Sequence, residues 1–239
     1  MRIDVFFTPP GVNAGDLSGR GVVVIDVLRA TTTVITALAN GAKAVIPAAT
    51  SEEAVRLASN LEKDGVVLAG ERKSLRIEGF ALGNSPLEMT PAAVGGKTIV
   101  LATTNGTPAL VAAQGGDPVL VGAAVNFKAL TQRTRELVAR GTDLVIICAG
   151  RDRQFAVEDG YMAGRLIRAV KRGVKKLTLN DAATAAVALT PAFAGWSEAL
   201  VGSEAARQLA DVDLAEDVRF AAQPDRFTVV PSYADRRIT

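Results

Sequence analysis

The stretch GVVVIDVLRATTTVITALANG, from Gly21 to Gly41, decides the fold of this chain. It opens with Val22–Asp26, an apolar run that ends in a carboxylate and is typical of a strand buried on both faces. It continues with Thr31–Asn40, whose apolar residues have helical spacing and which stops at an Asn-Gly pair, a common helix end. A buried strand, a polar turn and a helix in this order indicate an α/β protein.

The same unit recurs along the chain with little sequence identity between the copies. Gly21–Pro47, Gly96–Gly122 and Gly141–Leu179 each contain a strand, a polar loop, a helix, a glycine and a second strand. This repetition predicts a three-layer αβα fold of βαβ units with a mainly parallel sheet, and it is compatible with two closely packed halves. The other predicted strands are Ile3–Phe7, Val45–Ile46 (ending at Pro47), Val66–Ala69, Thr98–Ala102, Val119–Gly122 and Leu144–Cys148. The other predicted helices are Ser51–Leu61 (with Ser51 as N-cap), Pro108–Ala113, Leu130–Arg140, Asp159–Lys171 and Ser203–Ala210.

No Ser- or Pro-rich linker divides the chain, so residues 1–239 are predicted to form a single unit. A weak break, where a subdomain boundary would fall, is the stretch Glu78–Gly96, which contains Gly, Pro and Asn. The tail from Ala210 has little periodicity and ends in the strand-like Phe227–Val230. A tail of this kind often packs against a second subunit, which leaves a homodimer open.

The composition excludes several kinds of chemistry. The chain has no histidine and one cysteine, which excludes His-dependent triads, His-ligated zinc and an intrachain disulfide, and which fits a reducing cytosol. The formal net charge is only +2, the acidic and basic residues are interspersed, and aromatic residues make up 5%, so nucleic acid is not an expected partner. The N-terminus lacks a signal-peptide pattern and no apolar run approaches ~18 residues, so we expect a cytoplasmic protein without a membrane partner.

Polar clusters follow the predicted strands, at the sheet edge where α/β proteins bind ligands. After the first strand come Asp26, Arg29 and Thr31-Thr32-Thr33, at the start of a helix whose amides favour an anion. After Thr98–Ala102 comes a second loop of this kind, Thr103-Thr104-Asn105-Gly106-Thr107, in which the glycine permits close backbone approach. Together these clusters predict a site for phosphate or another small anion.

Carboxylates at the same edge predict a hard metal ion. Asp26, Glu158 and Asp159 offer oxygen ligands of the kind that Mg²⁺ takes, one or two at a time, together with water and substrate oxygens. Simpler roles stay open for each group. Asp26 and the threonines could cap helices, and Arg29 could form a surface ion pair. Glu158 and Asp159 could interact only with the dipole of a helix.

Two known phosphatase patterns do not fit. Cys148 has Gln154 where a thiol phosphatase needs arginine, because Arg153 comes one residue too early, and a buried inert thiol is the simpler interpretation. A phosphatase of the haloacid dehalogenase type needs a second acid two residues after Asp26, where Leu28 stands. The phosphate-binding loop of nucleotide-binding proteins is absent from the sequence as well.

Four blocks, in order along the chain, resemble the 2-phosphosulfolactate phosphatase (ComB) family. They are VVIDVLRATTT at 23–33 with ALANGA at 37–42, GER at 70–72 with GFALGNSP at 79–86, TTNGT at 103–107, and CAG at 148–150 with ED at 158–159 and AG at 163–164. The sequence departs from the family at Ala81, where an acid is expected, near Ser74, where a glycine is expected in a segment that is instead rich in Arg and Lys, and at Arg151-Asp152-Arg153, where a further glycine is expected.

The resemblance implies a magnesium-dependent phosphatase that hydrolyses (2R)-phospho-3-sulfolactate to 3-sulfolactate and phosphate, a step that serves coenzyme M synthesis in some archaea. It implies Asp26, Arg29 and Glu158 as catalytic residues, and Asp26, Glu158 and Asp159 as ligands of Mg²⁺. The residues expected to contact the small anionic substrate are Thr31, Thr32, Thr33, Arg72, Asn84, Ser85, Thr104, Asn105, Gly106, Thr107, Cys148 and Gly150.

Several alternatives remain at this point. The phosphate could be attacked directly by water, or Asp26 could attack it and form a phospho-aspartate. The substrate could be another small phosphorylated hydroxy acid. The chain could also be a non-catalytic module that binds phosphate or sulfonate, although such a module would not need the three acids.

Overall fold

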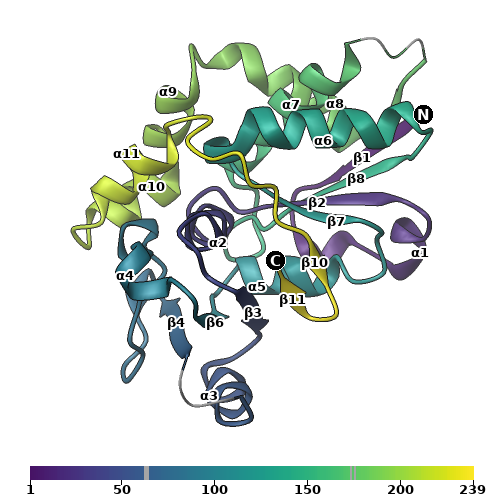
Figure 1. Ribbon diagram of the computed structural model, residues 1–239. Helices are drawn as coiled ribbons and strands as arrows, with labels where there is room; N and C mark the ends of the chain where they lie inside the picture. Colours follow the sequence, from purple (N-terminus) through teal and green to yellow (C-terminus); the bar gives the residue numbers. More distant parts are fainter. Residues whose placement is uncertain (62–64, 173, 175) are drawn as a thin grey trace.

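The strands of this protein form two sheets rather than one. The computed structural model describes residues 1–61, 65–172, 174 and 176–239, and Figure 1 shows how its elements are arranged. The first sheet has the order β7 (Val119–Gly122), β2 (Gly21–Ile25), β8 (Leu144–Cys148), β1 (Arg2–Phe6) and β9 (Thr178–Leu179), and all its neighbours are parallel. The second has the order β10 (Tyr233–Ala234), β11 (Arg237–Ile238), β3 (Ala44–Ala48), β6 (Thr98–Ala102), β4 (Val66–Arg72) and β5 (Leu75–Arg76). Its centre, β3-β6-β4, is parallel, and the outer strands are antiparallel additions.

Helices α2 (Ala30–Ala39) and α5 (Gly106–Ala112) lie between the two sheets and contact both. Helices α6 (Phe127–Ala139), α7 (Val157–Lys171) and α8 (Asp181–Leu189) cover the outer face of the first sheet, and α3 (Ser51–Ser59) covers the outer face of the second (Figure 1). Each sheet with its two helix layers is therefore an αβα sandwich, and the two sandwiches share their middle layer. The predicted α/β class, mainly parallel pairing and three-layer arrangement are confirmed.

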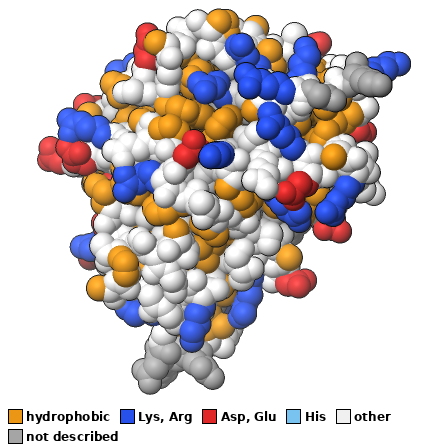
Figure 2. All heavy atoms as spheres, turned by 45° about the horizontal axis from the view of Figure 1, so that its top comes forward, with side chains coloured by type: hydrophobic (Ala, Val, Ile, Leu, Met, Phe, Trp, Pro, Cys, Tyr) orange, Lys and Arg blue, Asp and Glu red, His pale blue; other side chains and the backbone are white. Residues whose placement is uncertain are grey.

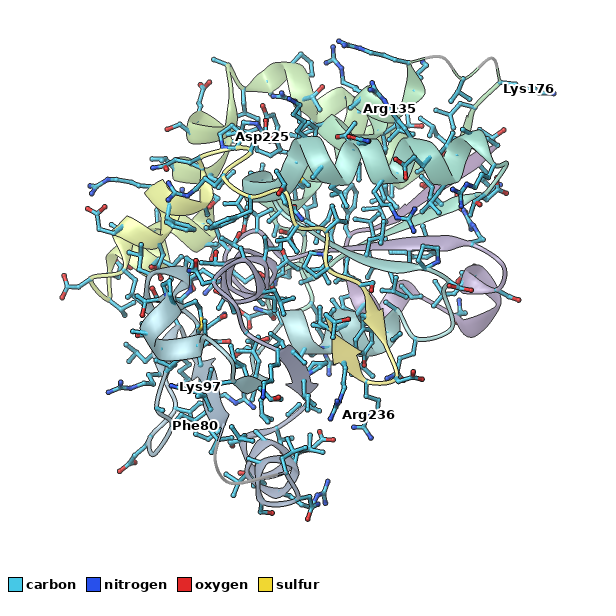
Figure 3. All side chains as sticks on the ribbon, in the orientation of Figure 1. Phe80, Lys97, Arg135, Lys176, Asp225 and Arg236 are labelled. Atoms are coloured by element: carbon cyan, nitrogen blue, oxygen red, sulfur yellow. The ribbon has the colours of Figure 1, made fainter. Side chains whose placement is uncertain are left out.

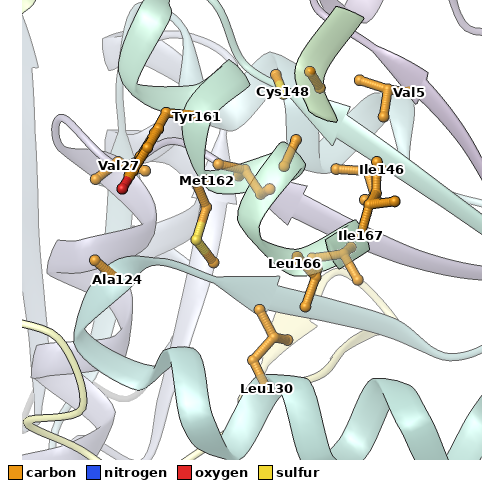
Figure 4. Packing of buried hydrophobic residues seen from close by; sticks show 14 of the residues in the cluster. Val5, Val27, Ala124, Leu130, Ile146, Cys148, Tyr161, Met162, Leu166 and Ile167 are labelled. Carbon is orange, nitrogen blue, oxygen red and sulfur yellow. The ribbon is translucent and has the colours of Figure 1, made fainter. Parts of the chain in front are cut away.

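The side chains of β2 show why its sequence is apolar without alternation. Val23 and Ile25 belong to the core cluster that contains residues of α6 and α7, while Val22 and Val24 belong to the cluster that contains residues of α2 and α5. A strand covered by helices on both faces has no solvent side, so a polar residue has no favourable place in it. Figure 4 shows the packing of the first cluster, where Leu130 of α6 and Ile167 of α7 approach the sheet.

Two of the three predicted βαβ units connect different sheets. In β2–α2–β3 the chain leaves the first sheet, and in β6–α5–β7 it returns to that sheet. Only β8–α7–β9 begins and ends in the same sheet. The prediction that the polar clusters lie at the edge of one sheet is therefore wrong, because β2 and β8 belong to one sheet and β4 and β6 to the other. The sequence pattern reports the burial of each strand, and a strand that crosses to a second covered sheet is as apolar as one that stays.

Several predicted element boundaries differ from the structure, and two of them have a clear local reason. Helix α3 is capped by Thr50, whose hydroxyl accepts the Glu53 N–H at 3.1 Å, and Ser51 is its first residue. Strand β3 also continues through Pro47 to Ala48. Proline has no backbone N–H to donate, but β11 pairs with β3 only at Val45. In the described part of the chain, Pro47 therefore costs no hydrogen bond between β3 and β11.

The C-terminal tail packs on its own chain. Phe227–Val230 is not a strand in the structure, although the Phe227 N–H donates to the Val125 carbonyl at 2.9 Å and the Val121 N–H to the Pro231 carbonyl at 2.9 Å. Asp225 accepts the Lys128 N–H at 2.6 Å beside the start of α6 (Figure 3). The β10–β11 hairpin completes the second sheet, and Arg236 at its tip reaches Glu53 of α3 at 2.9 Å. The tail thus connects both sheets, and a homodimer stays a prediction.

Three short helices come before Phe227, namely α9 (Trp196–Val201), α10 (Glu204–Ala210) and α11 (Ala215–Ala221). Helix α10 with the turn after it forms one wall of the cavity described below. The remaining helices are α1 (Ala14–Leu17), α4 (Pro91–Val94) and the 3₁₀ turns Pro9–Gly11, Pro86–Glu88, Ala124–Asn126 and Thr190–Ala192. The last two residues of the proposed break, Gly95 and Gly96, follow α4 and lead toward β6, so the stretch 78–96 connects two strands of the second sheet. Its role as a subdomain boundary stays a prediction.

The surface has mixed charge. Figure 2 shows Lys and Arg side chains interspersed with acidic and apolar ones over the face that it presents. Among the helices of the described residues, none combines the length and the apolar character needed to cross a membrane.

Candidate active site

A cavity of about 750 Å³ lies where the carboxyl ends of strands from both sheets meet. The loops after β2 and β8 approach it from the first sheet, and the end of β4 and the loop after β6 approach it from the second. Helix α10 and the turn after it close the remaining side. The lining residues are Asp26, Leu28, Arg29, Glu71, Arg72, Lys73, Ser74, Asn84, Thr103, Thr104, Asn105, Arg151, Asp152, Gln208, Leu209, Asp211 and Val212. A cavity of similar size, about 800 Å³, opens beside the β10–β11 turn and contains none of the motif residues.

The structure brings part of the predicted site together. Of the predicted residues, Asp26, Arg29, Arg72, Asn84, Thr104 and Asn105 line the cavity. The others do not line it: Thr31, Thr32, Thr33, Ser85, Gly106, Thr107, Cys148, Gly150, Glu158 and Asp159. Most of this second group is buried and hydrogen-bonded directly behind the lining residues, as described below.

Asp26 is the buried carboxylate at the end of β2. The N–H of Ala30, the first residue of α2, donates to its Oδ1 at 3.1 Å. Gly106, the first residue of α5, packs so closely that a Cβ there would lie 2.6 Å from Asp26 Oδ2 and 2.3 Å from the Ala30 Cβ. Only glycine therefore lets two helix starts meet at this carboxylate. Burial, together with the charges of Glu71 and Glu158, raises the pKa of Asp26 to about 7.

Arg29 is a fixed cation in the cavity wall. Its side chain is 4% exposed, its Nη1 donates to Asp217 Oδ2 at 2.6 Å, and its Nη2 donates to the Ser74 carbonyl at 2.8 Å. The first bond ties the cavity to α11 and the second ties it to the β4–β5 turn. Asp217 also accepts a hydrogen bond from the Ser85 hydroxyl at 2.6 Å, so Ser85 acts here through Asp217. The peptide bond between Leu28 and Arg29 is cis.

Glu71 and Asp217 are buried acids of the site that the sequence analysis missed. Glu71 accepts the Thr104 N–H at 2.7 Å and the Ser74 N–H at 2.9 Å, which joins the loop after β6 to the β4–β5 turn. Its position between Gly70 and Arg72 in a motif block was the available signal. No local signal marks Asp217, because it lies 188 residues from Arg29 in an unremarkable amphipathic segment.

The threonines after Arg29 hold the loop between β2 and α2. The Thr31 hydroxyl accepts the Asp26 N–H at 3.0 Å and lies 2.8 Å from the Gly122 carbonyl. The hydroxyls of Thr32 and Thr33 donate to the carbonyls of Val27 and Asn84, both at 2.8 Å. The Thr31 and Thr33 amides donate to the carbonyls of Asp26 and Arg29. These groups are therefore engaged within the protein rather than turned toward a ligand.

Thr107 has a similar supporting role at the start of α5. Its hydroxyl donates to the Thr103 carbonyl at 2.8 Å, and its amide donates to the Thr103 hydroxyl at 3.0 Å. Thr104 and Asn105, one turn earlier, face the cavity.

Asp159 connects the two cavity loops of the first sheet. Its carboxylate accepts the Val27 N–H at 2.9 Å on one oxygen and the Gly150 N–H at 3.1 Å on the other. Burial and the nearby charges of Asp26 and Glu158 raise the pKa of Asp159. Gly150 therefore contributes its backbone to the support of the site.

Glu158 and Cys148 face away from the main cavity. Glu158 is buried and lines a smaller cavity of about 320 Å³, together with Phe155 and Arg207; burial raises the pKa of Glu158. Cys148 packs in the core between β8 and α7 (Figure 4), where burial raises the pKa of its thiol well above the usual range. The expectation that this thiol contacts substrate at the cavity is not supported by its position, because the packed side chain is only 1% exposed.

The donors at this site suit a magnesium ion that takes few protein ligands. Within the described residues, no three His, Cys, Asp or Glu side chains converge as a ready-made metal cage. Mg²⁺ usually needs only one or two carboxylates, since water and substrate phosphate complete its shell. Asp26 lines the cavity, and the charges of Glu71 and Glu158 reach it, so a cation beside Asp26 would relieve a repulsion between buried carboxylates.

An α/β fold with a charged cavity at the carboxyl ends of its strands defines the class of α/β proteins that bind small molecules at this position. The sequence matches the family model described as 2-phosphosulpholactate phosphatase over residues 6–236, and the chain belongs to this family. It is 38% identical over 232 residues to a probable 2-phosphosulfolactate phosphatase of Caldanaerobacter subterraneus, covering 97% of this chain and 95% of that protein. It is 34% identical over 238 residues to the probable 2-phosphosulfolactate phosphatase of Clostridium acetobutylicum, covering 100% of both chains. A third relative with the same name, from Symbiobacterium thermophilum, is 38% identical over 226 residues, covering 94% of this chain and 96% of that one.

Proposed function

We propose that this protein hydrolyses (2R)-phospho-3-sulfolactate to 3-sulfolactate and inorganic phosphate, with Mg²⁺ as its cofactor. The observation that carries the proposal is the cavity that places the buried Asp26 and Arg29 among further basic side chains, in a chain that belongs to this family over nearly its whole length. The names of its relatives point to the same reaction.

The charges of the cavity suit a substrate with several anionic groups. The basic lining residues are Arg29, Arg72, Lys73 and Arg151. Phosphosulfolactate carries a phosphate, a sulfonate and a carboxylate on three adjacent carbons, so it needs cations on more than one side. Both Nη atoms of Arg29 are anchored by hydrogen bonds, and Arg29 lines the cavity together with Asp26, which makes it the residue best suited to hold the phosphate.

In the proposed reaction, water attacks phosphorus in line with the ester oxygen, the P–O bond to the substrate breaks, and the released alkoxide takes up a proton. Arg29 stabilises the negative charge on the phosphate oxygens, and its fixed position requires no reorganisation during the reaction. Asp26 would hold the magnesium ion, with Glu158 and Glu71 as neighbouring carboxylates. When bound, the ion would neutralise part of the phosphate charge.

The decisive experiment is phosphate release by the purified full chain from 2-phosphosulfolactate, with Mg²⁺ or with EDTA. We expect turnover that EDTA abolishes, and we expect none from Asp26→Asn. Tight binding of the ester without phosphate release would instead indicate a non-catalytic anion-binding protein. Faster turnover of phospholactate or phosphoglycerate would indicate a phosphatase for another hydroxy acid.

A single-turnover reaction in ¹⁸O-labelled water, combined with a borohydride trap for an acyl phosphate, separates the two possible nucleophiles. Direct attack of water on phosphorus gives labelled phosphate and no trapped intermediate. If Asp26 attacks, a phospho-aspartate forms, and borohydride reduces Asp26 in the quenched enzyme. Water then releases labelled phosphate by attack on phosphorus, or unlabelled phosphate by attack on the carboxyl carbon. A reduced Asp26, or unlabelled phosphate, would therefore contradict the direct attack by water proposed above.

A further inference from the structure

Arg151 is a cavity arginine whose guanidinium forms only one long ion-pair contact in the part of the chain that the structure describes. Arg29 donates to Asp217 and to the Ser74 carbonyl, and Arg72 donates to the Glu71 carbonyl at 3.0 Å. In the described residues, the side chain of Arg151 donates no hydrogen bond, and its Nε is buried without an acceptor. The nearest carboxylate oxygen, Asp152 Oδ2, lies 3.9 Å from that Nε. A buried N–H without an acceptor is unfavourable unless a ligand accepts from it, and the guanidinium offers further donors beside this Nε.

The turn that carries Arg151 is held in place on both sides. The backbones of Arg151 and Gln154 exchange hydrogen bonds of 3.0 and 2.7 Å, with Asp152 and Arg153 at positive φ between them. The Asp152 N–H donates to Asn105 Oδ1 at 3.2 Å, which fastens the turn to the loop that follows β6 in the other sheet. Arg151 is thus presented by a tight turn and not by a long loop, and its side chain is 22% exposed.

Arg151 also lies where the two cavities of this region adjoin. It lines the main cavity with Asp26 and Arg29, and it lines the smaller cavity with Glu158 and Arg207. Its charge favours ionisation of Glu158, yet the two side chains form no ion pair within 4 Å in the described part of the chain. The cation is therefore available to an anion in the main cavity, and it reaches this cavity from a different loop than Arg29 does.

We infer that Arg151 binds the non-reacting oxyanion of the substrate, the sulfonate or the carboxylate, and so determines specificity for a phosphate ester that carries a second acid. The inference rests on the proposed function. Arg29 and Asp26 hold the phosphate, while Arg151, from the next strand of the same sheet, holds the other end of a small ester. A planar guanidinium suits both acids, because each presents two oxygens to its fork.

The test compares wild type and Arg151→Met on three esters. These are 2-phosphosulfolactate, 2-phospholactate, which lacks the sulfonate, and 2-sulfoethyl phosphate, which lacks the carboxylate. Removing a charge-assisted hydrogen bond should lower kcat/KM for 2-phosphosulfolactate by roughly 10- to 100-fold, mainly through a higher KM. The ester that lacks the recognised acid should lose little. Its identity shows whether Arg151 reads the sulfonate or the carboxylate.

The matched control is Arg153→Met, in the same turn but exposed and outside the lining of either cavity. It should leave all three esters unaffected, and Arg151→Lys should recover part of the loss on 2-phosphosulfolactate. An equal loss of kcat/KM on all three esters would assign Arg151 to the phosphate and overturn the inference. Unchanged kcat/KM values for all three esters would overturn it as well. If the wild-type protein hydrolyses none of the esters, the proposed function itself fails, so the two failures are distinguishable.

Discussion

Asp26 shows how one residue couples the chemistry of this protein to its stability. The carboxylate is buried, meets the starts of two helices and lies near Glu71 and Glu158, and its pKa rises from 3.8 to about 7. A carboxyl with a raised pKa binds its proton more tightly in the folded than in the unfolded chain. The free energy of unfolding therefore falls as the pH rises from about 4 to about 7, and it levels off above that range.

Asp26→Asn is accordingly expected to stabilise the metal-free protein while it abolishes turnover. The gain should be small near pH 4, grow through the range up to about 7, and reach at most about 4 kcal/mol, the equivalent of the full pKa shift. Urea unfolding at several pH values in EDTA measures it. The exposed Asp213→Asn serves as control and should show no such trend. If Asp26→Asn were less stable than the wild type at neutral pH, the conclusion that the ionised Asp26 lowers the free energy of unfolding would be wrong.

Magnesium should restore the free energy of unfolding that the wild type loses near neutral pH through the ionised Asp26. A ligand that binds only the folded chain raises the free energy of unfolding, by about 2.7 kcal/mol at a concentration 100 times its Kd. We therefore expect Mg²⁺ to raise the Tm of the wild type near neutral pH and to leave Asp26→Asn nearly unchanged. Thermal unfolding with and without Mg²⁺ tests this without any assay of activity. An equal rise in both proteins would remove Asp26 from the metal site.

At the scale of elements, α11 acts on the site through Asp217. This helix contacts the cavity through the ion pair between Asp217 and Arg29, at 2.6 Å, with both side chains almost fully buried. Breaking a buried ion pair by removing one charge leaves the other without compensation and typically costs about 3–5 kcal/mol. The position of Arg29 thus depends on a helix near the end of the chain.

Asp217→Asn should therefore lower both stability and catalysis. We expect a loss of about 3 kcal/mol or more in the free energy of unfolding and a fall in kcat, because Arg29 loses its anchor. Urea unfolding and steady-state kinetics measure the two effects. Ser85→Ala removes the other hydrogen bond to Asp217 but keeps the ion pair, and it should cost only about 1–2 kcal/mol. Equal losses of stability in the two variants would contradict the conclusion that the ion pair to Arg29 stabilises the protein more than the Ser85 hydrogen bond does.

At the scale of the whole molecule, the shared middle layer should make the two sandwiches unfold together. One core cluster contains Val24 of the first sheet, Val45 of the second and Ile35 of the helix between them. The C-terminal tail adds a second connection, since Ile238, which is fully buried, pairs with β3. Cores that share side chains do not separate without exposing the shared surface to water.

We therefore expect one cooperative transition. Fluorescence of Trp196, which packs in the core cluster beside α7, reports the first sandwich, while far-UV circular dichroism reports both. The two probes should give coincident urea curves. Ile238→Ala, in the second sandwich, should shift both curves by the same amount, equivalent to about 2–4 kcal/mol. Separate transitions would instead support a subdomain boundary near 78–96.

Much of the architecture could be predicted from the sequence, because burial leaves a local trace. Helices such as α2 and α7 and strands such as β2, β6 and β8 have lengths and apolar patterns that can be recognised within a single segment. Six residues of the predicted site line the cavity, since ligand sites in α/β folds follow the carboxyl ends of strands. The sequence alone did not show which of the others lie behind the lining, because the orientation of a loop side chain depends on contacts with distant segments.

What the sequence by itself determined is the α/β class, the order of the main strands and helices, and the family to which the chain belongs. Only the tertiary structure decided that the strands form two sheets, that Thr31–Thr33 and Asp159 support the site from behind, and that Asp217 and Arg151 contribute to it. The physical reason is the range of the interactions. Periodicity reports whether a residue is buried, which is a local property. Which sheet a strand joins, and which carboxylate an arginine meets, depends on residues more than a hundred positions away, as Asp217 is from Arg29.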